Sequence, residues 1–222
     1  MKNSPSAGQL DHKYLWHPFT QMRDWLKTEP IILEQGKGSL LWDNTGRKYI
    51  DANSSIWTNL HGHNHPKINQ AIGKQLDKVS HVSALGFANT PAAKLGEQLI
   101  RLAKPRSRFP KTEPHLAKVF YSDDGSTATE VAIKLAYEHA RRTGRARTPR
   151  FLSLDGAYHG DTIGAVSAGH IDLFHKAYSG MLFKTDRVAS PYCYRCPFNK
   201  AKPERADARK YRKCNMECVD LV

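Results

Sequence analysis

At residues 119–127 the chain reads Val119-Phe120-Tyr121-Ser122-Asp123-Asp124-Gly125-Ser126-Thr127, so that strand-forming residues run directly into a polar turn with one glycine. Beyond the turn, apolar residues recur at helical spacing from Ala128 to Ala136, which predicts an amphipathic helix. The helix should end at Gly144, because arginines in the last turn suit the helix dipole and glycine adopts a left-handed conformation without strain. This stretch therefore predicts a strand, a tight turn and a helix.

The predicted start of this helix is a candidate phosphate site. The first N–H groups of a helix lack partners and lie at the positive end of its dipole, and Gly125 lets an anion approach closely. Ser126 and Thr127 add hydroxyl donors. The spacing matches neither the mononucleotide-binding nor the dinucleotide-binding glycine pattern. Local chemistry leaves two interpretations open, a phosphate site and an ordinary helix cap formed by Ser126.

Two short apolar segments, residues 118–121 and 150–154, bracket the predicted helix and have the composition of buried strands. A strand, a helix and a strand in this order form a unit with a parallel sheet and helices on its faces. The predicted fold class is therefore α/β.

The loop at residues 155–162 follows the second of these strands. Loops past the carboxyl ends of parallel strands form the ligand crevice of such a sheet, so this loop should face the start of the predicted helix. It carries two adjacent rings, Tyr158 and His159, between glycines. Such rings are suited to stacking on a flat aromatic cofactor, and an ordinary loop is the alternative.

The N-terminal part of the chain predicts a hairpin and two helices. Residues 31–51 alternate apolar and polar positions around Asp43-Asn44-Thr45-Gly46, which is typical of a β-hairpin. A loop rich in Ser, Asn, His and Gly follows at residues 53–66. Amphipathic helices, each with one face to bury, then begin at Pro66 and at Pro91, the second with Thr90 as its cap.

The composition is that of an ordinary globular protein, with 40% hydrophobic and 25% charged residues among 222. Neither a secretory signal nor a run long enough to span a bilayer is present, so we expect a cytoplasmic protein with no membrane partner. The net charge of +13 comes from Lys and Arg runs without interleaved aromatics. Because these runs follow helix ends or loops, where solvated cations are common, we expect no nucleic-acid partner.

The cysteines are a candidate zinc site. Cys193-x-x-Cys196 and Cys214-x-x-x-Cys218 are separated by 17 residues, close to the spacing of zinc ribbons. The alternative is four unrelated thiols, which are too few for a secreted disulfide scaffold. The alternating His61, His63 and His65 have no carboxylate at ligand spacing, so we expect no metal there.

Five segments resemble, in order along the chain, the class III aminotransferases, which are fold type I enzymes that use pyridoxal phosphate. The segments are Trp16-His17-Pro18-Phe19-Thr20-Gln21-Met22, Asn53-Ser54-Ser55-Ile56-Trp57, His61-Gly62-His63-Asn64-His65-Pro66, Asp123-Asp124-Gly125-Ser126 and Tyr158-His159-Gly160-Asp161-Thr162. The resemblance implies a truncated α/β fold with a mixed, mostly parallel sheet, flanking helices and the N-terminal hairpin segment. Residues 1–65 would contribute to the small domain and the substrate pocket. Residues 66–222 would form the first half of the cofactor-binding large domain, with a Cys-, Lys- and Arg-rich excursion at residues 192–218.

The resemblance also implies the roles of individual residues. Gly125 and Ser126 would hold the cofactor phosphate, while Tyr158 would lie by the pyridoxal ring and contact substrate, with His159 beside it. The substrate pocket would be lined by Phe19 and Trp57.

The family's Schiff-base lysine, and the aspartate that faces the pyridinium nitrogen, come later in the sequence of its members. We therefore expect both beyond Val222, so that this chain contains no catalytic residue and is inactive by itself.

Within the family, the resemblance is to enzymes of biotin synthesis that convert 8-amino-7-oxononanoate to 7,8-diaminononanoate. The amino donor would be S-adenosylmethionine or lysine. Phe19 and Ile56-Trp57 stand where users of S-adenosylmethionine have Tyr and two Trp, which favours lysine. The family forms homodimers. Two alternatives stay open, another class III ω-aminotransferase and a basic zinc- or nucleic-acid-binding module that is not an enzyme.

Overall fold

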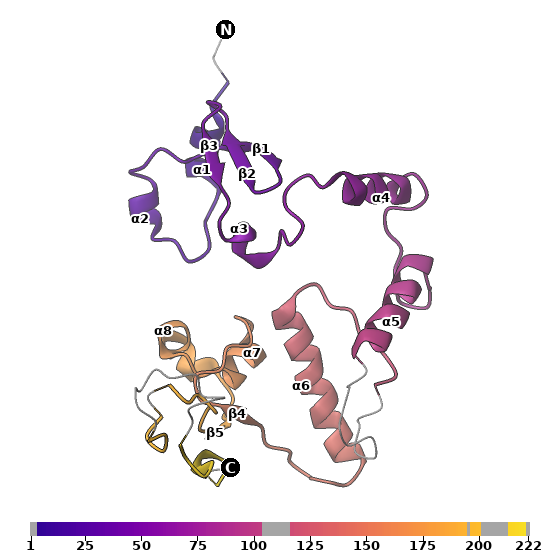
Figure 1. Ribbon diagram of the computed structural model, residues 1–222, viewed down its shortest axis with the longest axis vertical. Helices are drawn as coiled ribbons and strands as arrows, with labels where there is room; N and C mark the ends of the chain where they lie inside the picture. Colours follow the sequence, from indigo (N-terminus) through magenta and orange to yellow (C-terminus); the bar gives the residue numbers. More distant parts are fainter. Residues whose placement is uncertain (1–3, 104–115, 195, 201–212, 221–222) are drawn as a thin grey trace. The chain divides into compact units, whose positions relative to one another are not determined.

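The computed structural model describes residues 4–103, 116–194, 196–200 and 213–220 (Figure 1). The chain forms two compact units, Met1–Ala93 and Lys94–Val222. The domain boundary predicted at residues 65 and 66 refers to the domains of a complete aminotransferase, and it stays a prediction.

The first unit contains a three-stranded antiparallel sheet of β1 (Leu33–Lys37), β2 (Leu40–Asp43) and β3 (Lys48–Ile50), in that order across the sheet (Figure 1). The predicted hairpin is thereby confirmed. Its turn is held by Asp43, whose carboxylate accepts the backbone N–H groups of Thr45 and Arg47, each at 2.9 Å. Hydrogen bonds from the Thr45 hydroxyl and the Tyr49 phenol lower the pKa of Asp43 to about 2. The carboxylate is therefore charged at neutral pH.

The helices described in the first unit are α1 (Ala7–Tyr14), α2 (Met22–Trp25), α3 (Ser54–Trp57) and α4 (Pro66–Leu76). α1 begins with a capping box, in which the side chains of Ser6 and Gln9 each bind the backbone N–H of the other residue. α4 begins at Pro66 as the sequence predicts, because proline fits the first turn, where a backbone N–H has no intrahelical partner.

α5 (Thr90–Ala103) matches the second predicted helix, with a correction at its start. Thr90 is the first helical residue and not the cap. The side-chain oxygen of Asn89 caps the helix, because it accepts the N–H of Ala92 at 2.9 Å. In the described residues no helix has both the length and the apolar composition needed to cross a bilayer.

The predicted burial of one face of α4 and of α5 is wrong for the described structure. Ile72 in α4 is 54% exposed and Leu102 in α5 is 76% exposed. The apolar spacing is present in both helices, but spacing determines only which side chains share a face. Burial also requires another element to cover that face, and the exposures show that the described residues do not supply one.

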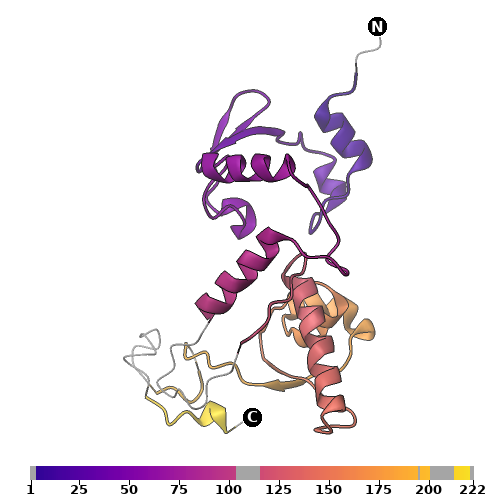
Figure 2. The same cartoon turned by 90° about the vertical axis from the view of Figure 1, so that its right-hand side faces the viewer.

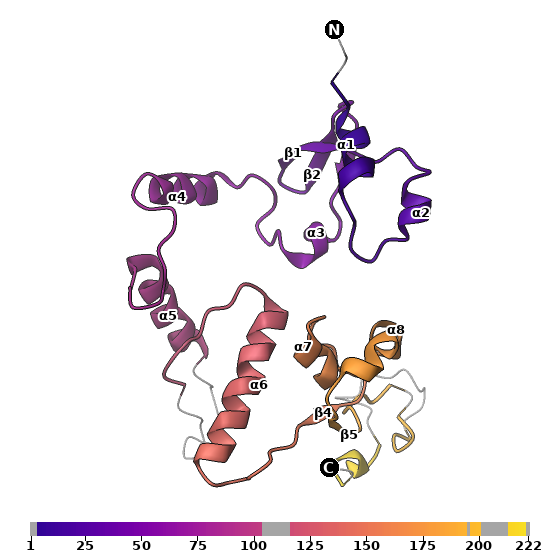
Figure 3. The same cartoon turned by 180° about the vertical axis from the view of Figure 1, so that it is seen from behind.

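The second unit combines a long helix, α6 (Gly125–Arg142), with a parallel pair of short strands, β4 (Leu152–Leu154) and β5 (Asp186–Val188). The connection between these strands contains α7 (Ile163–Ala168), α8 (Asp172–His175) and the 3-10 helix η2 (Lys176–Met181) (Figure 3). A further 3-10 helix, η3, spans Glu217–Val219. Parallel strands joined by a helical crossover are the α/β arrangement that the sequence predicts.

The strand predicted at residues 118–121 is not formed. Residues 116–122 pair with no strand among the described residues, and Phe120 is 68% exposed. A β-strand is defined by a hydrogen-bonded neighbour, so apolar composition alone does not make one. The strand predicted at residues 150–154 is present as β4, but Leu152 and Leu154 are half-exposed and not buried. The parallel pair is consequently β4 with β5.

The core of the second unit lies at α7, where Ala165, Val166 and Ser167 are at most 4% exposed. Figure 2 shows this region beside α6. The link between the two helices is Glu130 of α6, whose carboxylate accepts the N–H of Gly164 at 2.7 Å. A Cβ at Gly164 would lie 2.7 Å from the carboxyl carbon of Glu130, so glycine permits this close approach. The Thr162 hydroxyl, and then the N–H groups of Gly164 and Ala165, lower the pKa of Glu130.

We expect Glu130→Ala to loosen the start of α7, because loss of a capping side chain costs about 1–2 kcal/mol. That cost corresponds to roughly 5–30-fold faster exchange of the N–H groups of Gly164 and Ala165. Hydrogen–deuterium exchange of a peptide that covers residues 157–170 measures it. Glu138→Ala is the matched control, since Glu138 lies two turns further along α6 and binds Arg141 and Arg142.

The stabilisation of the start of α7 by Glu130 should depend on pH. Because the folded state lowers the pKa of Glu130, its contribution is complete above the unfolded pKa of about 4.5 and is lost as the pH falls through the lower folded value. Equal exchange of α7 in the two variants at neutral pH would show that Glu130 does not hold this helix.

Candidate functional site

The start of α6 is capped by Asp124. Its carboxylate accepts the N–H of Thr127 at 2.8 Å, and the Thr127 hydroxyl oxygen accepts the N–H of Asp124 at 3.1 Å. The interpretation that Ser126 forms the cap is therefore wrong. A capping box with Asp124 leaves the hydroxyl group of Ser126 for other contacts.

Two backbone donors remain open in the first turn of α6. Among the described residues, no acceptor binds the N–H groups of Gly125 and Ser126. A Cβ at Gly125 would meet nothing within 4 Å, so the backbone can be approached from outside. Unpaired N–H groups at the positive end of an 18-residue helix suit a bound phosphate.

The loop at residues 155–162 is fastened to this first turn, as the sequence predicts. The N–H of Asp161 donates to the Ser126 hydroxyl oxygen at 3.2 Å. The Thr129 hydroxyl lies 3.0 Å from the carbonyl oxygen of Gly125 and 3.3 Å from that of His159, and its one hydrogen is shared between them. Together with Glu130, these contacts put Ser126 and Thr129 on one polar face of α6, at i, i+3 and i+4 spacing. This face binds the continuous stretch 159–164.

Gly160 makes the fastening possible. Its φ of +116° is rarely adopted by residues with a side chain, and a Cβ there would lie 2.6 Å from the Cβ of Ser126 and 2.9 Å from its Cα. No side chain fits in that space. The loop can lie against α6 because residue 160 is glycine.

Tyr158 is held within the loop by its own hydroxyl group, which donates to the carboxylate of Asp161 at 2.6 Å. This hydrogen bond raises the pKa of Tyr158, so the phenol keeps its proton at neutral pH. Its ring is nearly parallel to that of His175, with an interplanar angle of 10° and centroids 6.3 Å apart. The side chain of His159 is exposed.

His175 is a neighbour of the loop that sequence reasoning missed. It lies at the end of α8 and is only 5% exposed, and its Nδ1 accepts the N–H of Ile171 at 3.2 Å. A Cβ at Gly169 would lie 3.1 Å from that nitrogen, so a second glycine allows the ring to pack closely. His175 and Tyr158 come together only in the folded chain. No regular spacing in the sequence predicts this contact.

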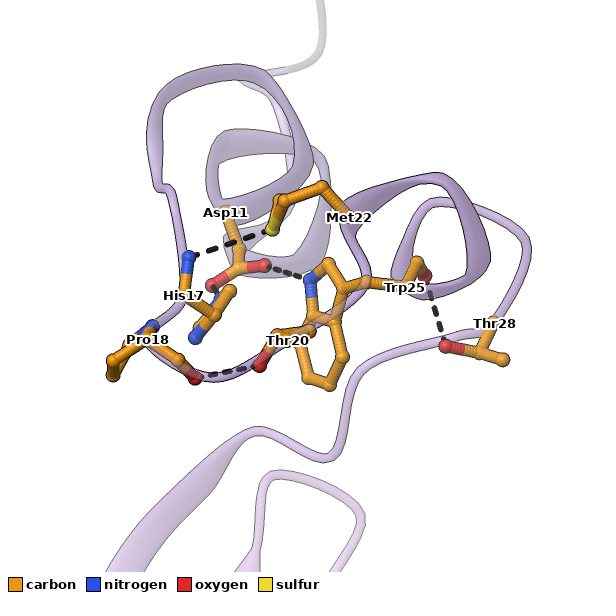
Figure 4. Close-up of polar contacts among 7 residues, drawn as sticks. All are labelled: Asp11, His17, Pro18, Thr20, Met22, Trp25 and Thr28. Atoms are coloured by element: carbon orange, nitrogen blue, oxygen red, sulfur yellow. Dashed lines mark hydrogen bonds and ion pairs between the residues drawn. The ribbon is translucent and has the colours of Figure 1, made fainter. Parts of the chain in front are cut away.

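The predicted pocket residue Phe19 lies in the first unit, in a short loop that Figure 4 shows in detail. Asp11 of α1 anchors the loop, since its carboxylate accepts the indole N–H of Trp25 and binds His17 Nε2, both at 2.8 Å. These two contacts, that of Trp25 first, lower the pKa of Asp11. The Thr20 hydroxyl closes the tip by donating to the carbonyl oxygen of Pro18 at 2.8 Å. Phe19 is thereby held with a φ of +49° and is 83% exposed.

Trp57, the other predicted pocket residue, ends α3 and is 84% exposed. Phe19 and Trp57 belong to the first unit, whereas Gly125, Ser126 and Tyr158 belong to the second. The structure thus describes two parts of the predicted site, each within its own unit.

The predicted zinc site is not formed. The four cysteines, Cys193, Cys196, Cys214 and Cys218, are free and half-buried. Within the part of the chain that the structure describes, no three His, Cys, Asp or Glu side chains gather closely enough to hold a metal ion. Zinc requires four ligands around one point, at about 2.3 Å for thiolates. Spacing along a chain does not bring two separate turns to one point.

An α/β unit with an open helix start and a tyrosine-bearing loop beside it is an arrangement that suits a phosphorylated ligand. The chain belongs to a family with that architecture, since residues 22–217 match the family described as Aminotransferase class-III.

Named relatives are similar over nearly the whole of this chain. An adenosylmethionine-8-amino-7-oxononanoate aminotransferase of Geobacter sulfurreducens is 43% identical over 209 residues, or 94% of this chain and 42% of that protein. Its counterpart in Aquifex aeolicus is 50% identical over 184 residues, or 83% of this chain and 39% of that protein. The chain therefore spans about two fifths of the length of these relatives.

Solved structures show the same likeness. The crystal structure of adenosylmethionine-8-amino-7-oxononanoate aminotransferase from Methanocaldococcus jannaschii matches with a TM-score of 0.76 and 41% identity, over 85% of this chain and 41% of that one. An ω-transaminase of Pseudomonas jessenii, solved in complex with PMP, matches with a TM-score of 0.76 and 25% identity, over 87% of this chain and 41% of that one. These matches confirm the predicted α/β fold of a fold type I enzyme, and this chain spans 41% of each matched chain.

We expect Gly160→Ala to separate the loop from α6, because the added methyl group would collide with Ser126. Gly156→Ala is the matched control: Gly156 also has a positive φ, +72°, but a Cβ there meets nothing within 4 Å. Alanine costs about 1–2 kcal/mol in the left-handed region near the φ of Gly156, and the φ of +116° at Gly160 is less favourable still. The collision belongs to Gly160 alone, so exchange of the Asp161 N–H should be at least roughly tenfold faster in Gly160→Ala than in Gly156→Ala.

Hydrogen–deuterium exchange of the loop measures the difference between the two variants. Identical exchange in Gly160→Ala and Gly156→Ala would mean that the close approach to Ser126 does not fix the loop.

Proposed function

We propose that this chain is the N-terminal portion of a pyridoxal-phosphate aminotransferase of biotin synthesis, which converts 8-amino-7-oxononanoate to 7,8-diaminononanoate. The observation that carries the proposal is the open first turn of α6 with the Tyr158 loop fastened to it. The substrate is proposed from the names of the relatives that match most of this chain.

The residues at the start of α6 fit a phosphate group. The N–H groups of Gly125 and Ser126 are unpaired among the described residues, and the helix dipole favours an anion there. The Ser126 hydroxyl oxygen accepts the Asp161 N–H, which leaves the hydroxyl hydrogen to donate. The nearby Asp124 carboxylate is an anion too, but it is turned toward the N–H of Thr127.

Pyridoxal phosphate, when bound, supplies the electron sink for the amino transfer. This chain's part is to hold and orient it. We assign its phosphate to Gly125 and Ser126, and its ring to Tyr158 with His159 beside it. The raised pKa of Tyr158 keeps the phenol protonated at neutral pH, so that it donates a hydrogen bond and adds no charge.

We assign Phe19 and Trp57 to the pocket for 8-amino-7-oxononanoate. Both are large aromatic side chains held outward by backbone with positive φ, which suits contact with an apolar carbon chain. The amino donor is S-adenosylmethionine or lysine, and Phe19 and Ile56 favour lysine by the resemblance described above. We propose a cytoplasmic enzyme that acts as a homodimer.

The exposed apolar faces of α4 and α5 support the proposal that this chain is a portion of a larger enzyme. The apolar residues of α4 and α5, and Phe120, have the pattern of interior positions but remain exposed in the described structure. The chain also spans only 42% and 39% of the two relatives described above. Further protein packed on these faces would bury them.

Binding of pyridoxamine phosphate tests the phosphate site, and this probe avoids the imines that an aldehyde forms with surface lysines. We expect Ser126→Asp to weaken binding at least roughly tenfold, because it puts a negative charge beside the phosphate. Ser80→Asp is the matched control, since it adds the same charge at an exposed position of the first unit. Equilibrium dialysis measures both affinities. Equal affinities, or equal binding of pyridoxamine without phosphate, would contradict the assignment.

An activity assay tests the expected inactivity of this chain. With pyridoxal phosphate, 8-amino-7-oxononanoate and either S-adenosylmethionine or lysine, we expect the 222-residue chain to form no 7,8-diaminononanoate. The reason is that the resemblance places the Schiff-base lysine outside this chain. Mass spectrometry detects the product, and its formation by the chain alone would show that a residue of this chain carries the chemistry.

A further inference from the structure

α3 is a left-handed turn. Its residues Ser54, Ser55, Ile56 and Trp57 have φ values of +53°, +50°, +61° and +67°. The N–H of Trp57 donates to the carbonyl oxygen of Asn53, and that of Thr58 to Ser54, each at 2.9 Å. These are helical hydrogen bonds, but of the hand that L-amino acids disfavour. Ile56 is the least expected residue here, because its β-branched side chain crowds the backbone at positive φ.

Glycine occupies most of the other left-handed positions described in the first unit, and Phe19 and Asn64 occupy the rest. Gly38, Gly46 and Gly62 have φ values of +57°, +83° and +77°, and glycine takes this conformation without strain. α3 uses four residues with side chains instead. A turn that only connected β3 to the following loop would not require them. We therefore infer that the turn serves to display the side chains of α3 at the surface.

Asp51 holds the turn in place. One carboxylate oxygen accepts the N–H of Ser55 at 2.9 Å, and the other accepts the Ser55 hydroxyl at 2.9 Å and binds His63 Nε2 at 2.7 Å. The side chain of Asp51 is 6% exposed, and that of His63 is 16% exposed. The anchor is thus enclosed.

The turn presents apolar side chains outward. Ile56 is 63% exposed and Trp57 is 84% exposed, so packing within the described structure does not account for the strained backbone. Backbone strain that persists without a packing reason is typical of functional sites. In a right-handed turn, the Cα–Cβ bonds of Ile56 and Trp57 would not point where they point in this left-handed turn.

We propose that Asp51 is a positioning residue for substrate recognition: by holding Ser55 it fixes the left-handed turn and so fixes the direction in which Trp57 meets the substrate. The substrate role of Trp57 rests on the proposed function. The positioning of Trp57 by Asp51 stands on the contacts of the first unit.

Fluorine NMR of the full chain labelled with 5-fluorotryptophan tests the positioning. The chain has four tryptophans, and Trp57→Phe assigns the Trp57 resonance. Asp51→Asn should shift or broaden this resonance and leave those of Trp16 and Trp25 in place. Asp43→Asn is the matched control, since Asp43 also holds a turn of the first unit through two backbone N–H groups. It should affect Trp42 and leave Trp57 unchanged.

An unchanged Trp57 resonance in Asp51→Asn would overturn the proposal. If Asp51→Asn unfolds the unit, all four resonances move to their denatured positions, and Ser55→Ala then decides. That variant removes only the hydroxyl contact and should shift the Trp57 resonance alone. Ser55→Ala without such a shift would overturn the proposal as well.

The strain in the turn has its own test, urea unfolding followed by tryptophan fluorescence, which reports the first unit because all four tryptophans lie there. Ile56→Gly should raise the urea midpoint, since glycine relieves the positive φ. Ile72→Gly, at a similarly exposed residue in α4, should lower it, because glycine weakens an ordinary helix. A midpoint lowered equally by both variants would show that the turn stores no strain.

Titration with 8-amino-7-oxononanoate separates this inference from the proposed function. The compound should shift the Trp57 resonance in the wild type, and the shift should be lost in Asp51→Asn. No shift in the wild type would contradict the substrate role of Trp57. A shift that survives unchanged in Asp51→Asn would contradict the positioning role of Asp51.

Discussion

The close approach of Gly160 to Ser126 determines the geometry of the second unit around the candidate site. Because no side chain stands between them, the loop rests directly on the first turn of α6, where Asp161 binds Ser126. One turn further along, Glu130 binds the start of α7 in the same way. A single polar face of α6 therefore orders the loop, Tyr158 and the buried helix α7. The open N–H groups of Gly125 and Ser126 remain accessible beside it.

Carboxylates fix the turns of both units. Asp43 in the first unit accepts two backbone N–H groups and two hydroxyls, and Asp51 accepts the N–H and the hydroxyl of Ser55. Asp11 joins the side chains of His17 and Trp25. Asp124 and Glu130 each accept a backbone N–H at a helix start in the second unit. Backbone donors that would otherwise be unpaired are thereby satisfied, which is how loops rich in Ser, Asn and Gly keep one conformation.

The sequence was sufficient for features that are determined locally. The hairpin around Asp43, the start of α4 at Pro66 and the extent of α6 depend on neighbours a few residues apart, and all were predicted correctly. Features that depend on distant partners were not. The segment ending at Tyr121 has strand composition but forms no strand in the described structure, and the apolar face of α4 has helical spacing but remains exposed there. No periodic pattern in the sequence predicts the left-handed conformation of α3 or the packing of His175. The zinc prediction was wrong because cysteine spacing along the chain does not show whether two turns lie close together in the fold.

The exposed apolar faces of α4 and α5, together with the net charge of +13, determine how strongly copies of this chain associate in solution. Apolar stripes on different copies of the chain attract one another at contact, whereas like charges repel over about 10 Å at 0.1 M salt. Charge thus acts as the barrier that keeps such stripes apart at low ionic strength. Added salt shortens the range of the repulsion and leaves the short-range attraction, so the ionic strength of the buffer sets how far copies of this chain stay dispersed.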